Sequence, residues 1–187
     1  MKQAVEEPGD RAPAPGALRL VQVFVNTNDL ESGPDILPDE HALKAWMVDA
    51  NVLAPDAVVT AADHARAIEL REAIRELVSG HAGLPHDPRA ADVVNAIPVR
   101  AVLADPSTRF EPTAGGFDHA LGTIVAAIHA GIAEGTWERL KSCERDVCRW
   151  AFYDHSKNRS GHWCSMAVCG QREKNRRAYR RRVARGA

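Results

Sequence analysis

The four cysteines of this chain all stand in its last quarter, in two pairs with the same internal spacing: Cys143 with Cys148, and Cys164 with Cys169. Thiolates are soft, strong ligands, and four of them complete the tetrahedral shell of a zinc ion without leaving a position for water or substrate. The pattern therefore predicts a structural Zn²⁺ site. A basic segment of about fifty residues with few large apolar side chains cannot build a stable core alone, so metal binding must supply its folding free energy.

Two other uses of four cysteines remain open at this point. Iron–sulfur clusters are also held by four thiolates, and the colour of the purified protein would reveal one. Two disulfides are the third possibility. A reducing cytosol argues against them, as does the gathering of all four cysteines in one short window with none in the rest of the chain.

A run of basic residues follows the last cysteine, with Glu173 as the only opposing charge. Like charges at helical spacing oppose helix formation unless a polyanion relieves them, and arginine suits phosphates and guanine edges. We expect nucleic acid as the partner, DNA rather than RNA. For Arg172, support of the metal centre and phosphate contact are equally open roles, and a solvated tail or docking on an acidic protein surface is the alternative for the whole run. The predicted nucleic-acid contacts are Arg172, Lys174, Arg176, Arg177, Arg180 and Arg181.

The near-neutral net charge of −1 is an average of two unlike parts. Residues 1–138 hold 10 Lys and Arg against 21 Asp and Glu, a net charge of −11, whereas residues 139–187 hold 14 against 4, a net charge of +10. The chain of 187 residues suits one domain with a small appendage. Because it shows neither a long apolar run nor a secretion signal, we expect no membrane contact and a cytoplasmic location.

The acidic part predicts a mainly α-helical domain with one β-hairpin. The periodicity of segment 18–28 fits a helix or a strand and cannot decide between them; only the family resemblance described below favours a helix, with Asn26 and Thr27 as polar residues at its end or as ligand contacts. Asp39 and the Thr60–Asp63 pair are helix-start signals. We expect the arginines and glutamates of the longest helix to form a solvated face. The expected elements are helices after Asp39, over about 61–79, from Asp87 to about Ile97 and from Phe117, and strands at 99–103 and 109–111.

The basic part predicts a small treble-clef or zinc-ribbon-like domain that ends in a basic helix. Residues 149–153 are expected to form a strand, with Trp163 on the return strand. Ser165 is placed to cap a helix that runs to about Ala184 and carries Cys169 in its first turns. Val168, Asn175, Tyr179 and Val183 form a thin stripe that could lie on the acidic domain. The aromatic residues expected to pack around the metal are Trp150, Phe152 and Trp163.

Around the cysteines the sequence resembles the CGNR zinc finger family, in the stretches 139–143, 148–158 and 163–172, and the similarity covers nearly all of residues 139–182. Gln171 departs from it, because the family's naming motif has Asn there. The family usually carries an N-terminal ABATE domain, described as a stress-induced transcription regulator. The resemblance implies zinc and nucleic-acid binding. We therefore expect an α+β protein with a disordered tail (1–16), a mainly helical ABATE-like domain (17–136) and a CGNR-like zinc finger with a basic C-terminal helix (137–187).

Our hypothesis from sequence is a zinc-dependent, nucleic-acid-binding transcription regulator. The alternative is a protein-interaction module in which zinc only staples the fold and the basic helix binds an acidic protein. An enzyme is disfavoured, because the expected zinc shell is closed and the chain lacks a phosphate-binding glycine loop, a serine nucleophile elbow and an HExxH motif. The acidic domain leaves room for two further partners, a second copy of the chain and a small-molecule ligand.

Overall fold

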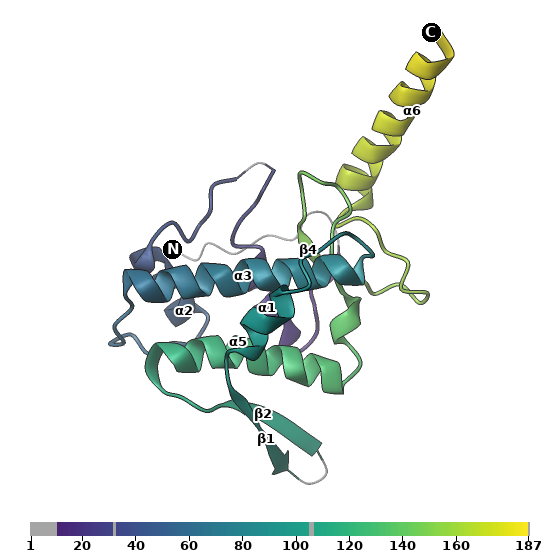
Figure 1. The fold of residues 1–187 in the computed structure, drawn as a ribbon. Coiled ribbons are helices and arrows are strands. Elements are labelled where there is room, and N and C mark those ends of the chain that lie inside the picture. The colour runs from purple at the N-terminus through teal and green to yellow at the C-terminus, as the bar shows by residue number, and fades with distance from the viewer. Residues whose placement is uncertain (1–10, 32, 105–106, 187) are drawn as a thin grey trace.

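The computed structural model describes residues 11–31, 33–104 and 107–186. Within these residues, the acidic part holds five α-helices and one hairpin, and the basic part holds a short hairpin, a π-helical turn and a final helix (Figure 1). The mixed α+β class and the terminal helix of the prediction are confirmed. In chain order the elements are α1 (Leu18–Val25), α2 (Glu40–Asp49), α3 (Ala61–His81), α4 (Ala90–Asn95), β1 (Val99–Ala104), β2 (Ser107–Pro112), α5 (Gly116–Ala133), η1 (Trp137–Arg139), β3 (Leu140–Ser142), β4 (Ala151–Tyr153), η2 (Met166–Gly170) and α6 (Gln171–Gly186).

The helix-start signals of the sequence act as predicted. The Asp39 side chain accepts a hydrogen bond from the Ala42 N–H (2.8 Å), which caps α2. Thr60 and Asp63 form a reciprocal capping box at the start of α3. Each cap satisfies amide groups that have no partner inside the helix, so the start of both helices is fixed locally.

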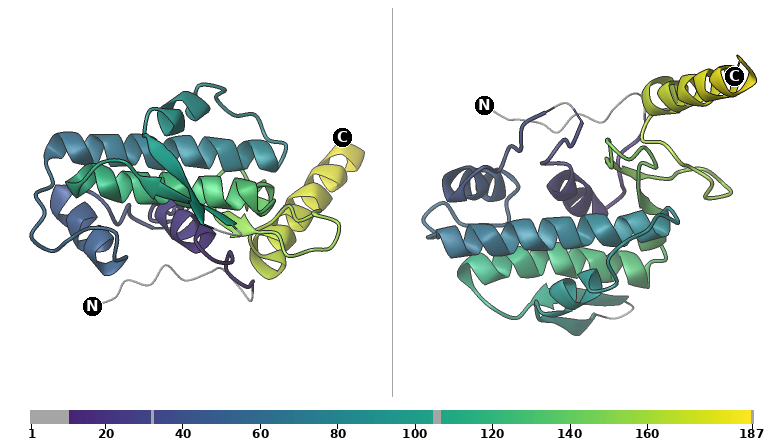
Figure 2. Two further views of the ribbon diagram at one scale, coloured as in Figure 1. Left: turned by 90° about the horizontal axis from the view of Figure 1, so that it is seen from below. Right: turned by 45° about the horizontal axis from the view of Figure 1, so that its top comes forward.

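The core of the acidic part forms where α1 packs against both α3 and α5. Gly131 of α5 allows the close approach of α1, because a Cβ atom there would lie 2.8 Å from Leu18 Cδ2. Ile132, near the end of α5, is 52% exposed. The β1–β2 hairpin packs on α5 through β2, on the side of the molecule away from α6 (Figure 2).

Two arginines of α3 contradict the prediction of a solvated face. Arg71 is 1% exposed, and its guanidinium donates to both carboxylate oxygens of Asp35 (2.8 and 2.7 Å). Arg75 is also buried and donates to the carbonyl of Val25 (2.7 Å), while Glu72 pairs with both arginines. The loop between α1 and α2 folds over this side of α3, which helical spacing alone cannot reveal.

The basic part shares the core of the acidic part. Trp137, Leu140, Ala151 and Tyr153 belong to the same buried cluster as the residues of α1, α3 and α5. Asn26 lies at this junction, where its side chain accepts from the Ala151 N–H (2.8 Å) and donates to the Ala151 carbonyl (2.8 Å). It thus occupies the free edge of β4 as a neighbouring strand would, a role that its place at the end of α1 does not suggest.

The hairpin of the basic part differs from the expected one. β4 pairs antiparallel with β3, in the register Leu140↔Tyr153 and Ser142↔Ala151. Trp163 was predicted on the return strand, but it lies outside the strands of the described residues. The partner of β4 is thus β3, which precedes the first cysteine pair. Cys143 and Cys148 lie in the turn that joins the two strands.

Residues 11–16 also differ from the prediction of a disordered tail, whose remainder, residues 1–10, lies outside the described residues. Ala14 is buried, and its N–H donates to Gln22 Oε1 (2.7 Å). The guanidinium of Arg11 lies 4.5 Å from the centroid of the Phe152 ring. Disorder was predicted from the composition of the segment alone. Composition does not reveal that the folded chain provides a surface on which this segment packs.

Helix α6 extends away from the rest of the molecule (Figure 1). The apolar stripe expected to lie on the acidic part does not do so, since Tyr179 is 70% and Val183 53% exposed. No helix within the described residues has the length and apolar character that a membrane span requires.

The ion pair between half-buried Asp35 and buried Arg71 gives a pH-dependent prediction. Burial alone would raise the pKa of Asp35, but hydrogen bonds from Arg71 and the Leu37 N–H outweigh it, so the pKa is lowered. A lowered folded-state pKa stabilises the fold above the unfolded value of about 3.9, and this contribution is lost as the pH falls through the folded-state value. Asp35→Asn should lower the free energy of unfolding by about 2 kcal/mol at neutral pH.

Urea denaturation of the wild type and of Asp35→Asn, repeated between neutral pH and pH 3, measures this difference in stability. Asp56→Asn, at an exposed position, is the control. The gap between wild type and Asp35→Asn should narrow below about pH 4. A gap that stays constant down to pH 3 would show that the ionised carboxylate is not what stabilises Arg71.

The pair of hydrogen bonds between the Asn26 side chain and the Ala151 backbone, called here the Asn26 clamp, gives a second prediction. Asn26→Ala leaves the buried N–H of Ala151 without its partner and the Ala151 carbonyl with only the longer bond from Gln22 Nε2 (3.3 Å), which should lower the free energy of unfolding of the zinc-loaded protein by about 2 kcal/mol. Asn95→Ala, at an exposed position of α4, is the matched control and should stay within about 0.5 kcal/mol. Equal stabilities of the two variants in urea denaturation would refute the clamp.

Candidate metal centre and basic helix

Two turns bring the four cysteines together. In the first, the Cys143 N–H donates to the carbonyl of Trp150 (2.9 Å) and the Cys148 N–H to that of Arg145 (2.8 Å), which folds the chain back between β3 and β4. In the second, Ser165 Oγ accepts from the Val168 N–H (3.2 Å) and caps the π-helical turn η2, which carries Cys169. Ser165 was expected to be this cap.

The sulfur atoms have the separation that one tetrahedral ion requires. All four Sγ atoms lie within 4.8 Å of one another, with Cys148–Cys164 at 3.7 Å and Cys164–Cys169 at 3.6 Å. With Zn–S bonds of about 2.3 Å, sulfurs at tetrahedral corners lie about 3.8 Å apart. All four cysteines are free and buried, so this arrangement contains no disulfide. The donor set fits a single zinc ion with a complete shell.

The ionisation of the sulfurs also indicates a cation. Hydrogen bonds from Cys148 and Cys164 lower the pKa of Cys143 to about 2. The same interactions with Cys143 raise the pKa of Cys148 and Cys164, and burial raises that of Cys169. The four sulfurs thus disfavour one another's ionisation, whereas a divalent ion stabilises four thiolates together and releases their protons.

Aromatic rings enclose the metal centre. Phe152 is fully buried among the four cysteines, and Trp150 and Trp163 pack against the cluster. These three residues are the aromatic core predicted from sequence. Their rings keep water from the sulfurs and provide the small apolar core that the metal completes.

The chain matches two known families in the comparisons. Residues 18–136 match the family described as "Putative stress-induced transcription regulator" (ABATE), and residues 139–182 match the CGNR zinc finger. The chain belongs to the ABATE family. A search of curated proteins finds no match to it. The four buried cysteines lie inside the matched zinc finger, so the ABATE protein carries a zinc centre.

Gln171, which stands where the CGNR motif has Asn, makes a local contact in this ABATE protein. Its side-chain amide donates to Asn175 Oδ1 (3.0 Å), one turn further along α6, and both residues are exposed. The longer side chain therefore lies along the helix surface.

A loop next to the metal centre is organised by a buried carboxylate. Asp154 is fully buried and accepts hydrogen bonds from Lys141 Nζ (2.9 Å) and from the N–H groups of Ser156 (3.0 Å) and Gly161 (2.7 Å). Burial alone would raise the pKa of Asp154, but these bonds hold it well below its usual value. Residues 154–161 are thus a structured connection between β4 and the second cysteine pair.

Glu31 joins the ABATE domain to the zinc finger. Its carboxylate accepts from Arg172 at the start of α6 (2.7 Å) and forms an ion pair with Arg145 of the first cysteine turn. Arg145 interacts in turn with the Cys169 sulfur. Two roles were open for Arg172, support of the metal centre and phosphate contact. In the structure Arg172 binds Glu31, and Arg145 is the arginine that lies beside a metal ligand. The loop that carries Glu31 gives no signal in the sequence.

The other predicted contact residues fall into two groups. Arg176 and Arg177 pair with Glu173 (2.7 and 3.1 Å). Lys174, Arg180 and Arg181 are exposed and have no ion-pair partner among the described residues, and the same holds for Arg182 and Arg185, which the predicted contact set omitted. The cations that remain open to a polyanion therefore lie mainly in the outer half of α6.

The metal centre gives a prediction about stoichiometry. Native mass spectrometry should find one zinc ion per chain, and Cys→Ser substitution at any of the four ligands should abolish it. A chelator should increase solvent exposure of Trp150 and Trp163, seen as a red shift of tryptophan fluorescence. His162→Ala is the control, because His162 pairs with Glu144 and lies outside the ligand set. Loss of zinc in His162→Ala would contradict a shell of four sulfurs.

Proposed function

We propose that this ABATE protein is a cytoplasmic, nucleic-acid-binding transcription regulator in which the zinc centre orders α6 so that it can bind a phosphate backbone. Its family and its four-cysteine zinc finger support the regulatory part of this proposal. The role is a binding one without catalysis, since four thiolates leave no open position on the metal.

The observation that carries the proposal is a set of five cations on α6 that have no ion-pair partner within the described part of the chain: Lys174, Arg180, Arg181, Arg182 and Arg185. The helix extends into solvent, so these side chains are not shared with the acidic domain (Figure 1). Their mutual repulsion disfavours the isolated helix, and a polyanion removes that repulsion.

The dimensions of α6 favour duplex DNA as the polyanion. The helix has 16 residues and therefore measures about 24 Å, and the DNA major groove is about 12 Å wide and accepts one α-helix. The major groove of an RNA duplex is too narrow for side chains to reach the base edges. Arginine forms bidentate hydrogen bonds to phosphate and to guanine, so the same residues serve both affinity and base contacts.

A protein partner is the second candidate function. Tyr179 and Val183 are exposed on α6 beside the arginines, and a helix with an apolar stripe and basic flanks also suits an acidic protein groove. In that case the zinc centre only stabilises the fold of the basic part.

Salt dependence provides the test of nucleic-acid binding. Five phosphate contacts should give a log–log slope of affinity against salt of about −4 to −5 for duplex DNA. Arg180→Ala/Arg181→Ala/Arg182→Ala should reduce that slope by about 3 units, measured by fluorescence anisotropy. The matched control, Arg89→Ala/Arg100→Ala/Arg109→Ala, removes three exposed arginines from the acidic part and should leave the slope unchanged.

Two results would count against this function. A flat salt dependence of wild type would exclude phosphate contacts by α6. Equal effects of the two triple variants would show that binding follows total charge and does not involve α6 in particular.

A further inference from the structure

Two carboxylates, those of Glu31 and Glu173, form ion pairs with arginines in the first half of α6. Glu31 neutralises Arg172, and Glu173 pairs with both Arg176 and Arg177, so in the half of the helix near the metal every cation except Lys174 has a partner among the described residues. The pKa of Glu173 is lowered by its hydrogen bonds from Arg176 and Arg177, which keeps that carboxylate ionised. The inner half thus holds the helix in place and offers little free positive charge.

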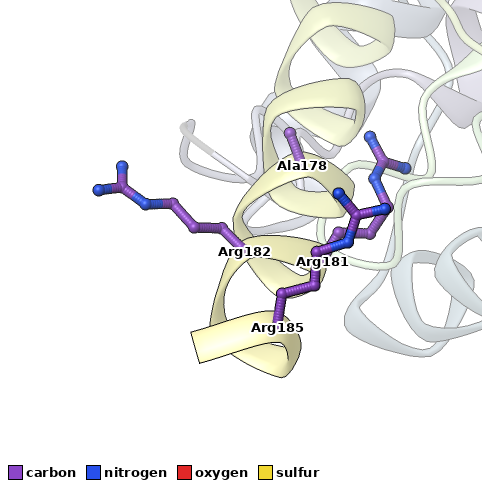
Figure 3. A pocket seen from close by; sticks show the side chains of 4 residues that line it. All are labelled: Ala178, Arg181, Arg182 and Arg185. Carbon is purple, nitrogen blue, oxygen red and sulfur yellow. The ribbon is translucent and has the colours of Figure 1, made fainter. Parts of the chain in front are cut away.

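The outer half contains a hollow whose walls are arginine side chains. It is lined by Arg181, Arg182 and Arg185 around Ala178 (Figure 3). In the figure Arg182 extends to one side of the helix, and Arg181 and Arg185 lie on the other. Ala178 has only a methyl group, so the space between the three side chains is open to solvent.

We propose that this hollow is the seat of a backbone phosphate of nucleic acid, and the point on α6 where binding is centred. The proposal rests on the nucleic-acid binding proposed above and adds the location of the contact. The guanidinium groups of Arg181 and Arg185, which lie on one side of the helix, can donate to the free oxygens of one phosphate, and Arg182 on the other side is available for the next phosphate or a base edge. The small side chain of Ala178 lets a phosphate approach the helix surface.

The geometry also accounts for Arg182 and Arg185, which the sequence-based contact set left out. None of the three lining arginines has an ion-pair partner among the residues that the structure describes, so no salt bridge must break when a phosphate arrives. In the inner half, by contrast, a phosphate would have to displace a carboxylate from Arg172, Arg176 or Arg177.

A carboxylate placed inside the hollow tests the proposal. In Ala178→Glu the new side chain lies three and four positions before Arg181 and Arg182, the spacing at which Glu and Arg pair on a helix. It should occupy the phosphate seat, weaken duplex DNA binding at least about tenfold at low salt, and reduce the salt slope by about 2 units. Asn175→Glu is the matched control, because it adds the same charge one turn away from the hollow. That variant should weaken binding less than about threefold.

The outcomes separate this inference from the proposed function. If wild type does not bind duplex DNA at low salt, the proposed function itself fails. If wild type binds and the two variants weaken binding equally, the hollow is not the seat, while nucleic-acid binding stands. If Ala178→Glu abolishes binding of inorganic pyrophosphate but leaves DNA affinity unchanged, the hollow takes a free anion and the inference is overturned. Both variants must retain one zinc ion and wild-type helicity.

Discussion

The convergence of four sulfurs on one ion is the interaction on which the basic part of this protein depends. Cys143 and Cys148 close the turn between β3 and β4, and Cys164 and Cys169 define the turn from which α6 starts. Without a cation each thiolate disfavours the ionisation of the neighbouring thiols, so the four sulfurs need a metal ion to be charged together. Metal binding therefore sets both the shape of the finger and the point from which the basic helix extends.

The direction of α6 also depends on the acidic part, because the two parts are joined by a common core and by polar contacts. Asn26 occupies the free edge of β4, and Arg75 donates to the carbonyl of Arg149 (3.3 Å), just before that strand. Glu31 binds Arg145 on the first cysteine turn and Arg172 at the start of α6. A change in the loop that carries Glu31 would thus reach α6 through direct contacts. This gives the regulatory family a physical link between its helical domain and its proposed nucleic-acid-binding element.

The sequence predicted those features that are set by local chemistry. The cysteine spacing identified the metal ligands, and Asp39, Thr60 and Ser165 marked helix starts, because a cap acts within one turn of its own position. The errors lie where distant segments meet. Arg71 and Arg75 have the spacing of a solvated face but are covered by a loop, β4 pairs with a strand before the cysteines, and residues 11–16 pack on the finger. Glu31 and Arg145 gave no sequence signal, since an ion pair between distant surface-type residues leaves no pattern.

The most direct test of the account is X-ray absorption spectroscopy at the zinc K edge of the purified full-length protein. The account predicts a first shell of four sulfur atoms at about 2.3 Å, with no nitrogen or oxygen neighbour. A shell with a nitrogen or oxygen ligand, or a protein in which the cysteines are oxidised and hold no metal, would contradict it. In that event the position of α6, and the proposal that it binds nucleic acid, would lose their physical basis.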